Sequence, residues 1–402
     1  MDMTVGHLGG MVVAVLRASG YAELTIGQYE KTIKALRLFV AGRGGVYTKT
    51  LGAQFAASTI SEKTGRVSAA RRFSYTRLVS VFDILVDTGE VVLATRKRGG
   101  GGPRPVSTEF VALDAAWEVD MRERGLAAAT REAYGRVARS FLSYLEQCSV
   151  TRLDQVRPDM VAGFLVSLLD RWASTSLFWV VSNFRPFLVF TSRRDLVEAV
   201  NQARIRRPHM VMAVMGDEDV RRVVDVCATP GMVTARDAAV TLLALLTGLR
   251  ACDIAALRLG DIEWRSQTLT VIQQKTKNPV TLPLPDLVVA RLAEYVHNER
   301  PHTGDDHVFL RQIAPFLPLF DHSTVHRITT VVFRKAGVVQ PNAGTRLLRH
   351  TAATRLLRAA TPLSTISAVL GHARVESTRV YLSVDDERLV GCVLPVPAGA
   401  FS

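Results

Sequence analysis

The chain has 402 residues, of which 48% are hydrophobic, and its 50 Lys and Arg outweigh 37 Asp and Glu to give a formal net charge of +13. This length is enough for two or three hydrophobic cores, and the apolar fraction excludes an intrinsically disordered chain. The sequence has neither an apolar run of about 18 residues nor a secretory leader pattern, so we expect a soluble, cytoplasmic protein without a membrane partner.

The positive charge favours a polyanionic partner, because counterions released from phosphates contribute binding affinity. Nucleic acid is the favoured partner, and the alternative is a basic protein whose charge only opposes aggregation. The four cysteines are far apart and form no C-x-x-C pair. They indicate reduced, packed thiols, not a zinc site or a disulfide framework, and no metal or cofactor is implied.

Two short segments are predicted to be linkers. The first, residues 96–105, contains Arg96-Lys97-Arg98, four glycines and two prolines, which neither a helix nor a strand tolerates. The second, residues 204–209, is a basic connector. These segments predict an N-terminal helical module of residues 1–95, a helical domain of residues 106–203 and a C-terminal domain of residues 210–402.

The first two helical segments are predicted to be tandem copies of one module. At an offset of 105 residues Gly20 corresponds to Gly125 and Tyr29 to Tyr134, and apolar residues recur at helical spacing around both tyrosines. A later helix is expected at residues 73–86 in one copy and 177–190 in the other. The alternative is that any two amphipathic helices share such a pattern.

The C-terminal segment is predicted to be mostly α-helical with a small antiparallel β-sheet. Strands are expected at residues 269–273 and 280–283, joined by a turn through residues 275–278. Helices are expected at residues 217–228, 234–246, 285–296, 323–335, 346–359 and 362–369.

Near its end the chain concentrates groups suited to phosphodiester chemistry. Tyr381 follows His372 by nine residues, and Arg346 and Arg349 lie upstream, so a hydroxyl, an imidazole and two guanidiniums fall within 36 positions. A tyrosine hydroxyl is a nucleophile, and guanidiniums neutralise charge on an attacked phosphorus.

Two further cations precede this cluster. Arg250 follows a glycine turn, where its planar fork suits phosphate, although an arginine three residues before Asp253 is more often a structural ion pair. Lys275 lies in the predicted hairpin turn, from which an ammonium can protonate a leaving oxygen. The alternatives are a solvated turn lysine and the competing candidate Lys277.

These motifs, in this order and at these spacings, resemble the tyrosine recombinase (phage integrase) family. The resemblance covers about 180 residues and rests on Gly248-Leu249-Arg250 with Asp253, Lys275-Thr276, Arg349-His350-Thr351, Leu370-Gly371-His372 and Tyr381. It implies a mixed α+β catalytic domain preceded by a SAM-like helical core-binding domain, residues 106–203, that clamps DNA. Residues 1–95 are then an arm domain or a second copy of that clamp.

The resemblance also implies a role for each matched residue. Tyr381 is the nucleophile that forms a 3′-phosphotyrosine and releases a 5′-hydroxyl, and Lys275 is the general acid for that oxygen. Arg250 and Arg349 stabilise the pentacoordinate transition state, and His372 hydrogen-bonds the scissile phosphate.

One position departs from the family pattern. Arg346 stands where the family usually has His, and a guanidinium, with a pKa above about 12, is a poor general base. Arg346 still donates to phosphate, so we expect retained but altered chemistry. His350 is left out of the catalytic set because the family has a supporting His there.

The partner expected from this resemblance is double-stranded DNA, bound by a homo-tetramer in the synaptic complex. Arg204, Arg206 and Arg207 are expected to follow the DNA backbone, unless the connector is merely solvated. The expected activity is site-specific recombination for integration, excision or transposition of a mobile element. The alternatives are a type IB topoisomerase-like enzyme and a catalytically silent DNA-binding protein. Accessory DNA-bending proteins are a further partner class for the recombinase.

Overall fold

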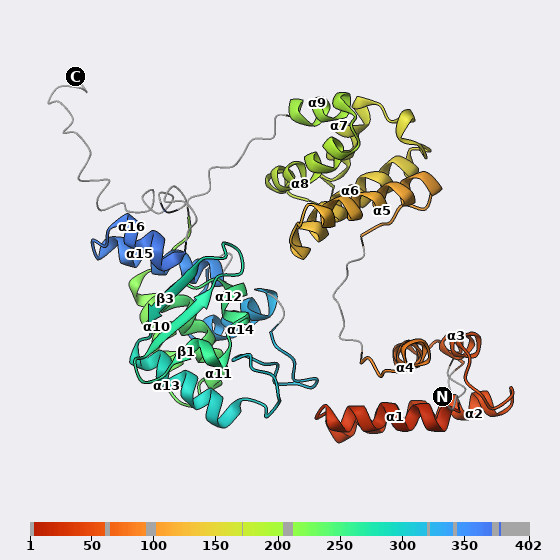
Figure 1. Ribbon diagram of the computed structural model, residues 1–402, viewed down its shortest axis with the longest axis horizontal. Helices are drawn as coiled ribbons and strands as arrows, with labels where there is room; N and C mark the ends of the chain where they lie inside the picture. Colours follow the sequence, from red (N-terminus) through yellow and green to blue (C-terminus); the bar gives the residue numbers. More distant parts are fainter. Residues whose placement is uncertain are drawn as a thin grey trace. The chain divides into compact units, whose positions relative to one another are not determined.

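The computed structural model describes residues 4–60, 65–93, 102–170, 172–203, 212–319, 322–340, 344–371 and residue 378. Its contacts divide the chain into two compact units, one of Thr95–Met210 and one of Met1–Ala94 together with Val211–Ser402. Each of the three helical regions in Figure 1 has its own hydrophobic core. Among the described residues, no helix is both long enough and apolar enough to cross a bilayer.

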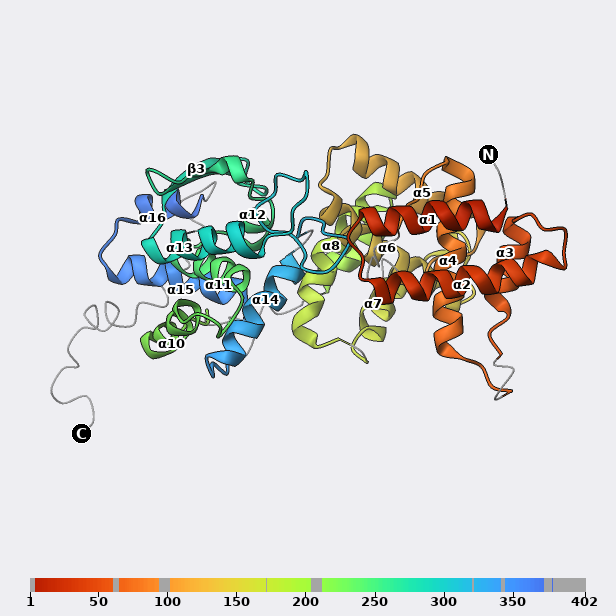
Figure 2. The same cartoon turned by 90° about the horizontal axis from the view of Figure 1, so that it is seen from below.

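The N-terminal region consists of four helices, α1 (Val5–Ala18), α2 (Glu23–Ala41), α3 (Lys49–Ala57) and α4 (Ala69–Thr88). Side-chain oxygens of Thr4, Thr48 and Ser68 cap the first turns of α1, α3 and α4. Helices α1 and α2 run side by side (Figure 2) and are joined through Gly20, whose φ of 72° lies in the left-handed region.

The central unit is built around aromatic side chains. Its helices are α5 (Thr108–Glu123), α6 (Ala128–Gln147), α7 (Pro158–Ser167), α8 (Leu177–Phe190) and α9 (Arg194–Gln202), with 3₁₀ turns at Leu153–Gln155 and Ser174–Ser176. The rings of Phe141, Phe164 and Phe184 meet edge to face at centroid distances of 4.7–5.3 Å. The helix predicted at residues 177–190 is confirmed, and that predicted at 73–86 lies within α4.

The C-terminal region combines helices with one small sheet. Its helices are α10 (Asp217–Ala228), α11 (Ala235–Leu242), α12 (Ala251–Ala255), α13 (Asp286–Glu294), α14 (His322–Lys335), α15 (Thr345–Arg358) and α16 (Leu363–Leu370), and a 3₁₀ turn spans Leu259–Asp261. π-helical turns extend α11 through Leu243–Thr247 and α13 through Tyr295–Glu299. The predicted helices are thus present here, with boundaries shifted by a few residues.

The sheet has three antiparallel strands, β1 (Ile262–Glu263), β2 (Thr268–Ile272) and β3 (Pro279–Pro283). Leu269 pairs with Leu282 and Val271 with Val280, and all four side chains are buried. The sequence predicted the β2–β3 hairpin and missed β1, because two residues are too few to show an alternating pattern. The fold class, mostly helical with a small antiparallel sheet, is confirmed.

Helix α15 occupies the position that organises the site. It packs against the buried π-helical turn after α11 and against α16, and α16 lies beside β3 (Figure 1). A small apolar cluster of Ala353, Leu357, Ile366 and Leu370 joins α15 to α16. These contacts bring together chain segments that are far apart in the sequence.

Candidate active site

Arg250 is placed by a turn that requires glycine. Gly248 ends the π-helical turn with a φ of 68°, and a Cβ on it would lie 2.7 Å from the Leu370 side chain. A larger residue would face both backbone strain and a steric clash. Gly248 therefore allows the chain to turn closely against α16 and to present Arg250 at the start of α12.

The guanidinium of Arg250 is tied to a buried glutamine. Its Nη1 donates to Oε1 of Gln273 at 2.5 Å, and Nε2 of Gln273 donates to the Leu370 carbonyl at 2.9 Å. The Gln273 side chain is fully buried, and the Arg250 side chain is 19% exposed. One edge of the guanidinium is thus anchored while the group keeps access to solvent.

Arg349 is anchored on the same carbonyl. From α15 its Nη2 donates to the Leu370 carbonyl at 2.9 Å and its Nη1 to the Gly248 carbonyl at 2.6 Å. Arg349 and Gln273 therefore share one acceptor, and Gln273 carries Arg250. The two arginines predicted to act together are brought together at Leu370, two residues before His372.

Asp253 supports this arrangement through contacts with Arg250 and with the hairpin turn. It is fully buried, and its Oδ1 accepts a 2.8 Å hydrogen bond from the backbone N–H of Gln274. Its Oδ2 lies 3.9 Å from Nη1 of Arg250 and has no hydrogen-bond partner among the described residues. The carboxylate balances the arginine charge and holds the beginning of the hairpin turn.

Lys275 lies in the turn between β2 and β3, as predicted, and is exposed. The turn is closed by a 2.9 Å hydrogen bond from the Lys277 N–H to the Gln273 carbonyl, and Lys277 has a φ of 59°. Thr276 donates to Oε1 of Gln273 at 2.8 Å and to the Gly371 carbonyl at 3.3 Å. The turn that carries Lys275 is therefore attached to Gln273 and to the segment Leu370-Gly371, the same centre that holds both arginines.

Arg346 and His350 lie one helical turn apart on α15. Arg346 is exposed in the first turn, and His350 is half-buried. Burial, followed by the positive charges of Arg346 and Arg349, lowers the pKa of His350 from 6.5 to about 4, partly opposed by a hydrogen bond with the Ala213 backbone. His350 is therefore neutral at physiological pH, which fits a supporting role.

Sequence reasoning assigned no role to the two residues that connect Arg250, Arg349 and the hairpin turn, Gln273 and Gly371. Gly371 has a φ of 60°, and a Cβ on it would lie 2.3 Å from the Gln273 amide. The alternation of the hairpin strand could have identified Gln273, because every second residue, Leu269, Val271 and Gln273, points to the buried face. A polar residue on that face needs internal hydrogen-bond partners.

Several predicted site residues lie outside the described residues, namely His372, Tyr381, Arg204, Arg206 and Arg207. Thr378, three positions before Tyr381, is described and is fully buried.

One group in the described part of the chain has metal-ligand chemistry. Donor atoms of Asp305, Asp306 and His307 lie within 4.8 Å of one another. However, Asp306 forms an ion pair with Arg258 at 2.5 Å, and Asp305 accepts from the backbone N–H of His307 at 2.8 Å. These contacts account for the cluster as a structural clasp.

The sequence matches known proteins over most of its length. Residues 213–388 match the phage integrase family, and residues 117–195 match the N-terminal SAM-like domain of phage integrases. The tyrosine recombinase XerC of Mesorhizobium japonicum is 31% identical over 301 residues, which cover 71% of this chain and 95% of that protein. The y4rA protein of Sinorhizobium fredii, named as an integrase/recombinase, is 30% identical over 291 residues, or 71% of each chain.

Solved structures share the fold at lower identity. The XerH site-specific recombinase bound to its difH substrate has a TM-score of 0.53 and 15% identity, covering 89% of this chain and 94% of that one. A lambda integrase tetramer bound to a Holliday junction has a TM-score of 0.52 and 16% identity, covering 79% and 90%. With the sequence matches, these similarities show that the chain is a member of the phage integrase family, the tyrosine recombinases.

Proposed function

We propose that this protein is a site-specific DNA recombinase that integrates, excises or transposes a mobile element. The observation that carries the proposal is the common anchoring of Arg250 and Arg349 at the Leu370 carbonyl, next to the segment that contains His372. Two fixed guanidiniums are suited to the non-bridging oxygens of a phosphodiester, because they need little reorganisation as charge develops.

The proposed reaction is a reversible transesterification. The phenolic oxygen of Tyr381 attacks the phosphorus, the bond to the 5′-oxygen breaks, and Lys275 supplies the proton that this leaving oxygen requires. A 3′-phosphotyrosine and a free 5′-hydroxyl result, and attack by a 5′-hydroxyl of a second strand reverses the step. The phosphotyrosine bond conserves the energy of the broken bond, so the cycle needs no ATP.

Arg346 changes the first proton transfer in this scheme. Because a guanidinium stays protonated at neutral pH, it does not accept the phenol proton, which passes to water. The guanidinium of Arg346 instead favours the phenolate through its positive charge, and its N–H groups donate hydrogen bonds to phosphate. The expected result is active cleavage with a slower chemical step than a histidine at position 346 would give.

The proposed substrate complex is a homo-tetramer holding two DNA duplexes. Residues 106–203 clamp the duplex that the catalytic domain cleaves, and Arg204, Arg206 and Arg207 of the connector contact its backbone. The apolar segment of residues 389–394 suits docking on a neighbouring subunit. Accessory DNA-bending proteins are a further partner class compatible with this assembly.

Two other functions fit some of these observations. A type IB topoisomerase-like enzyme would use the same chemistry on one duplex, and the tandem N-terminal modules favour the recombinase over it. The other is a catalytically silent DNA-binding protein, in which loss of activity would explain why Arg346 replaces the usual histidine. The anchoring of Arg250, Arg349 and the Lys275 turn at one centre favours an active enzyme.

The proposal is tested with suicide substrates nicked near the scissile phosphate and drawn from the ends of the element that encodes the protein. Wild type should give a covalent DNA adduct on a denaturing gel, and Tyr381→Phe should give none. Tyr134→Phe is the control, because its half-buried ring stacks on Trp117 at 6.4 Å and the change keeps that ring in place. Specific binding without any adduct would establish the silent protein, and adducts without exchange between two sites would establish the topoisomerase-like enzyme.

A further inference from the structure

The N-terminal region repeats the architecture of the central unit. Each begins with four helices in the same order, α1 to α4 and α5 to α8. In both copies a left-handed glycine, Gly20 or Gly125, follows the first helix, with a φ of 72° or 66°. The second helix is then preceded by Ala22 or Ala127 in the same extended conformation.

Equivalent positions also fill the two cores. At the constant offset of 105 residues the following pairs are all buried: Val5 and Phe110, Val12 and Trp117, Leu16 and Met121, Leu36 and Phe141, Val40 and Leu145. The residues differ in size while their place in the helices stays the same. The two regions are therefore copies of one module, of which residues 117–195 match the SAM-like domain of phage integrases.

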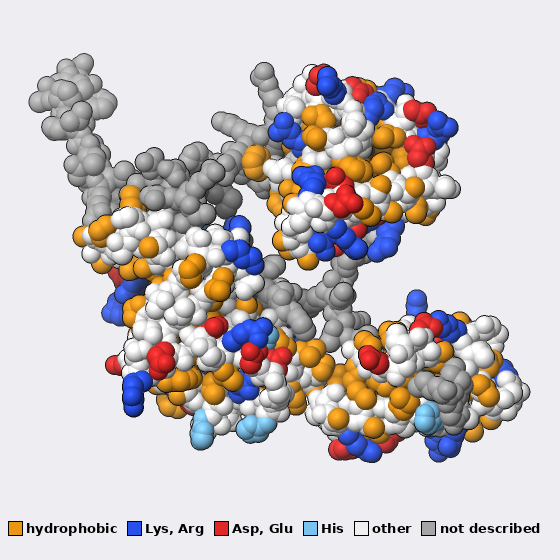
Figure 3. Space-filling model, viewed as in Figure 1, with side chains coloured by type: hydrophobic (Ala, Val, Ile, Leu, Met, Phe, Trp, Pro, Cys, Tyr) orange, Lys and Arg blue, Asp and Glu red, His pale blue; other side chains and the backbone are white. Residues whose placement is uncertain are grey.

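The copies differ in charge. Residues 102–203 contain twelve basic and twelve acidic residues, whereas residues 1–93 contain eleven basic and seven acidic ones. On the face seen in Figure 3, acidic and basic side chains of the central unit lie next to each other. Ion pairs of the central unit engage Arg122, Arg124, Arg131, Arg136, Arg139, Arg152, Arg157 and Arg193.

Lys31 and its counterpart Arg136 show how this difference arises. Arg136 pairs with Glu132 one helical turn earlier at 3.2 Å. The position equivalent to Glu132 is Gly27 in the N-terminal copy, so the exposed Lys31 has no carboxylate at that place. The cation is thus kept while its acidic partner is absent.

Lys34 and Arg139 are a second pair in which the cation is kept and its acidic partner is absent from the N-terminal copy. Here packing explains why the acidic residue is absent. Arg139 lies 3.9 Å from Asp114, and its side chain is only 13% exposed. The equivalent of Asp114 is Gly9, where a Cβ would lie 2.6 Å from Ile33, the residue that replaces the small Ala138. A carboxylate does not fit there, and Lys34 is exposed.

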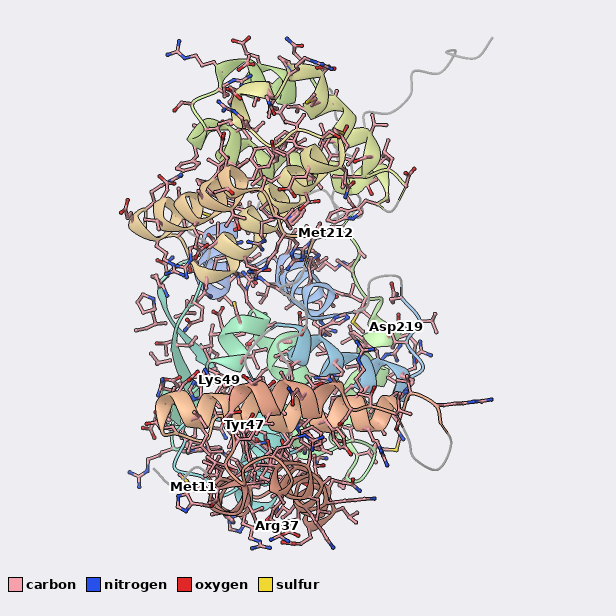
Figure 4. All side chains as sticks on the ribbon, turned by 90° about the vertical axis from the view of Figure 1, so that its right-hand side faces the viewer. Met11, Arg37, Tyr47, Lys49, Met212 and Asp219 are labelled. Carbon is pink, nitrogen blue, oxygen red and sulfur yellow. The ribbon has the colours of Figure 1, made fainter. Side chains whose placement is uncertain are left out.

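Two carboxylates on α4 of the N-terminal copy are already engaged. Asp83 accepts from the Tyr47 hydroxyl at 2.7 Å, and Asp87 pairs with Lys49 at 2.6 Å; Figure 4 labels Tyr47 and Lys49. Among the described residues, no ion pair engages Lys31, Lys34 or Arg37, which follow one another at three-residue spacing along α2. Arg37 is also labelled in Figure 4.

We propose that the exposed α2 cations Lys31, Lys34 and Arg37 bind the phosphate backbone of duplex DNA. The N-terminal copy thereby serves as a second clamp that adds sequence-independent affinity. The inference rests on the proposed function, because it takes DNA as the substrate. Duplex phosphate is the fitting ligand, since a row of unpaired cations on one helix gains most from releasing several condensed counterions at once.

The test measures the affinity of the full chain for a random-sequence duplex as a function of salt. The variants are Lys31→Gln/Lys34→Gln and Gly27→Glu, which restores the acidic residue of the other copy. Gly27 is exposed on α2, and a Cβ there meets nothing within 4 Å, so the fold tolerates the change. Gly27→Gln is the control for Gly27→Glu, because it adds a side chain of the same length without the charge. Arg17→Gln is the control for the double variant, because it removes a cation that already pairs with Glu30 at 3.2 Å.

The double variant should lower the slope of log affinity against log salt by about 1.8, because each lost phosphate contact contributes about 0.9. Gly27→Glu should weaken binding about tenfold near 0.1 M salt, whereas both controls should behave as wild type. If the slope of log affinity against log salt were unchanged in all variants, the proposal would be overturned. The N-terminal module would then bind a partner other than DNA. Adduct formation through Tyr381 is scored separately, so a failure of strand cleavage is distinguishable from a failure of this clamp.

Discussion

Arg250 donates a 2.5 Å hydrogen bond to Gln273, a fully buried side chain that in turn donates to the Leu370 carbonyl. Because Arg349 donates to the same carbonyl, Gln273 fixes the separation of the two guanidiniums. Thr276 of the hairpin turn also donates to Gln273. A residue with no chemistry of its own thus sets the geometry of the proposed phosphate site.

Replacing this glutamine should reduce cleavage more than binding. In Gln273→Leu, Arg250 loses its anchor and the Leu370 carbonyl loses a donor, so the guanidinium no longer sits where charge develops. We expect cleavage of a nicked substrate to slow about 100-fold, with DNA affinity nearly unchanged. The control is Gln274→Leu, at an exposed neighbouring position whose backbone N–H alone contacts Asp253. Equal losses of affinity and rate in Gln273→Leu would contradict a positioning role.

Gly371→Ala should disturb the same centre from the other side. The left-handed φ of 60° disfavours alanine, and its methyl group would lie 2.3 Å from the Gln273 amide. We expect a loss of about 1–3 kcal/mol in the free energy of unfolding, measured by urea denaturation, and a strong loss of cleavage. Gly260→Ala is the control, because its Cβ would meet nothing within 4 Å. A Gly371→Ala protein as stable and active as the control would exclude this close contact.

Local sequence patterns predicted the elements well and their mutual contacts poorly. Helix α10 was predicted with its observed bounds because its acidic first turn and helical periodicity act within a few residues. The π-helical turn of Leu243–Thr247 and the two-residue strand β1 have no such local signature. Arg250 and Arg349 were recognised from motifs, whereas their common anchor at Leu370 depends on tertiary packing.

His350 should make the protein less stable at mildly acidic pH. Its pKa falls from 6.5 to about 4 on folding, so the unfolded state binds more protons between these values. The free energy of unfolding should therefore decrease as pH falls from about 6.5 to 4, by about 2 kcal/mol for this half-exposed ring. Urea denaturation of His350→Gln across this range should show a shallower decrease than wild type. Parallel pH profiles for the two proteins would exclude His350 as the titrating group.

Arg346→His should accelerate cleavage and make it pH-dependent. A histidine with a pKa near 6.5 becomes a base above that pH and accepts the phenol proton, which the permanently charged guanidinium does not. On nicked substrates we expect at least about tenfold faster adduct formation at pH 8, with the rate rising through pH 6–7. Arg346→Gln, which removes the charge without supplying a base, should be slower than wild type at every pH. If Arg346→His were slower as well, the arginine would be contributing its charge to the phosphate site, and the exposed first turn of α15 would have adapted to that use.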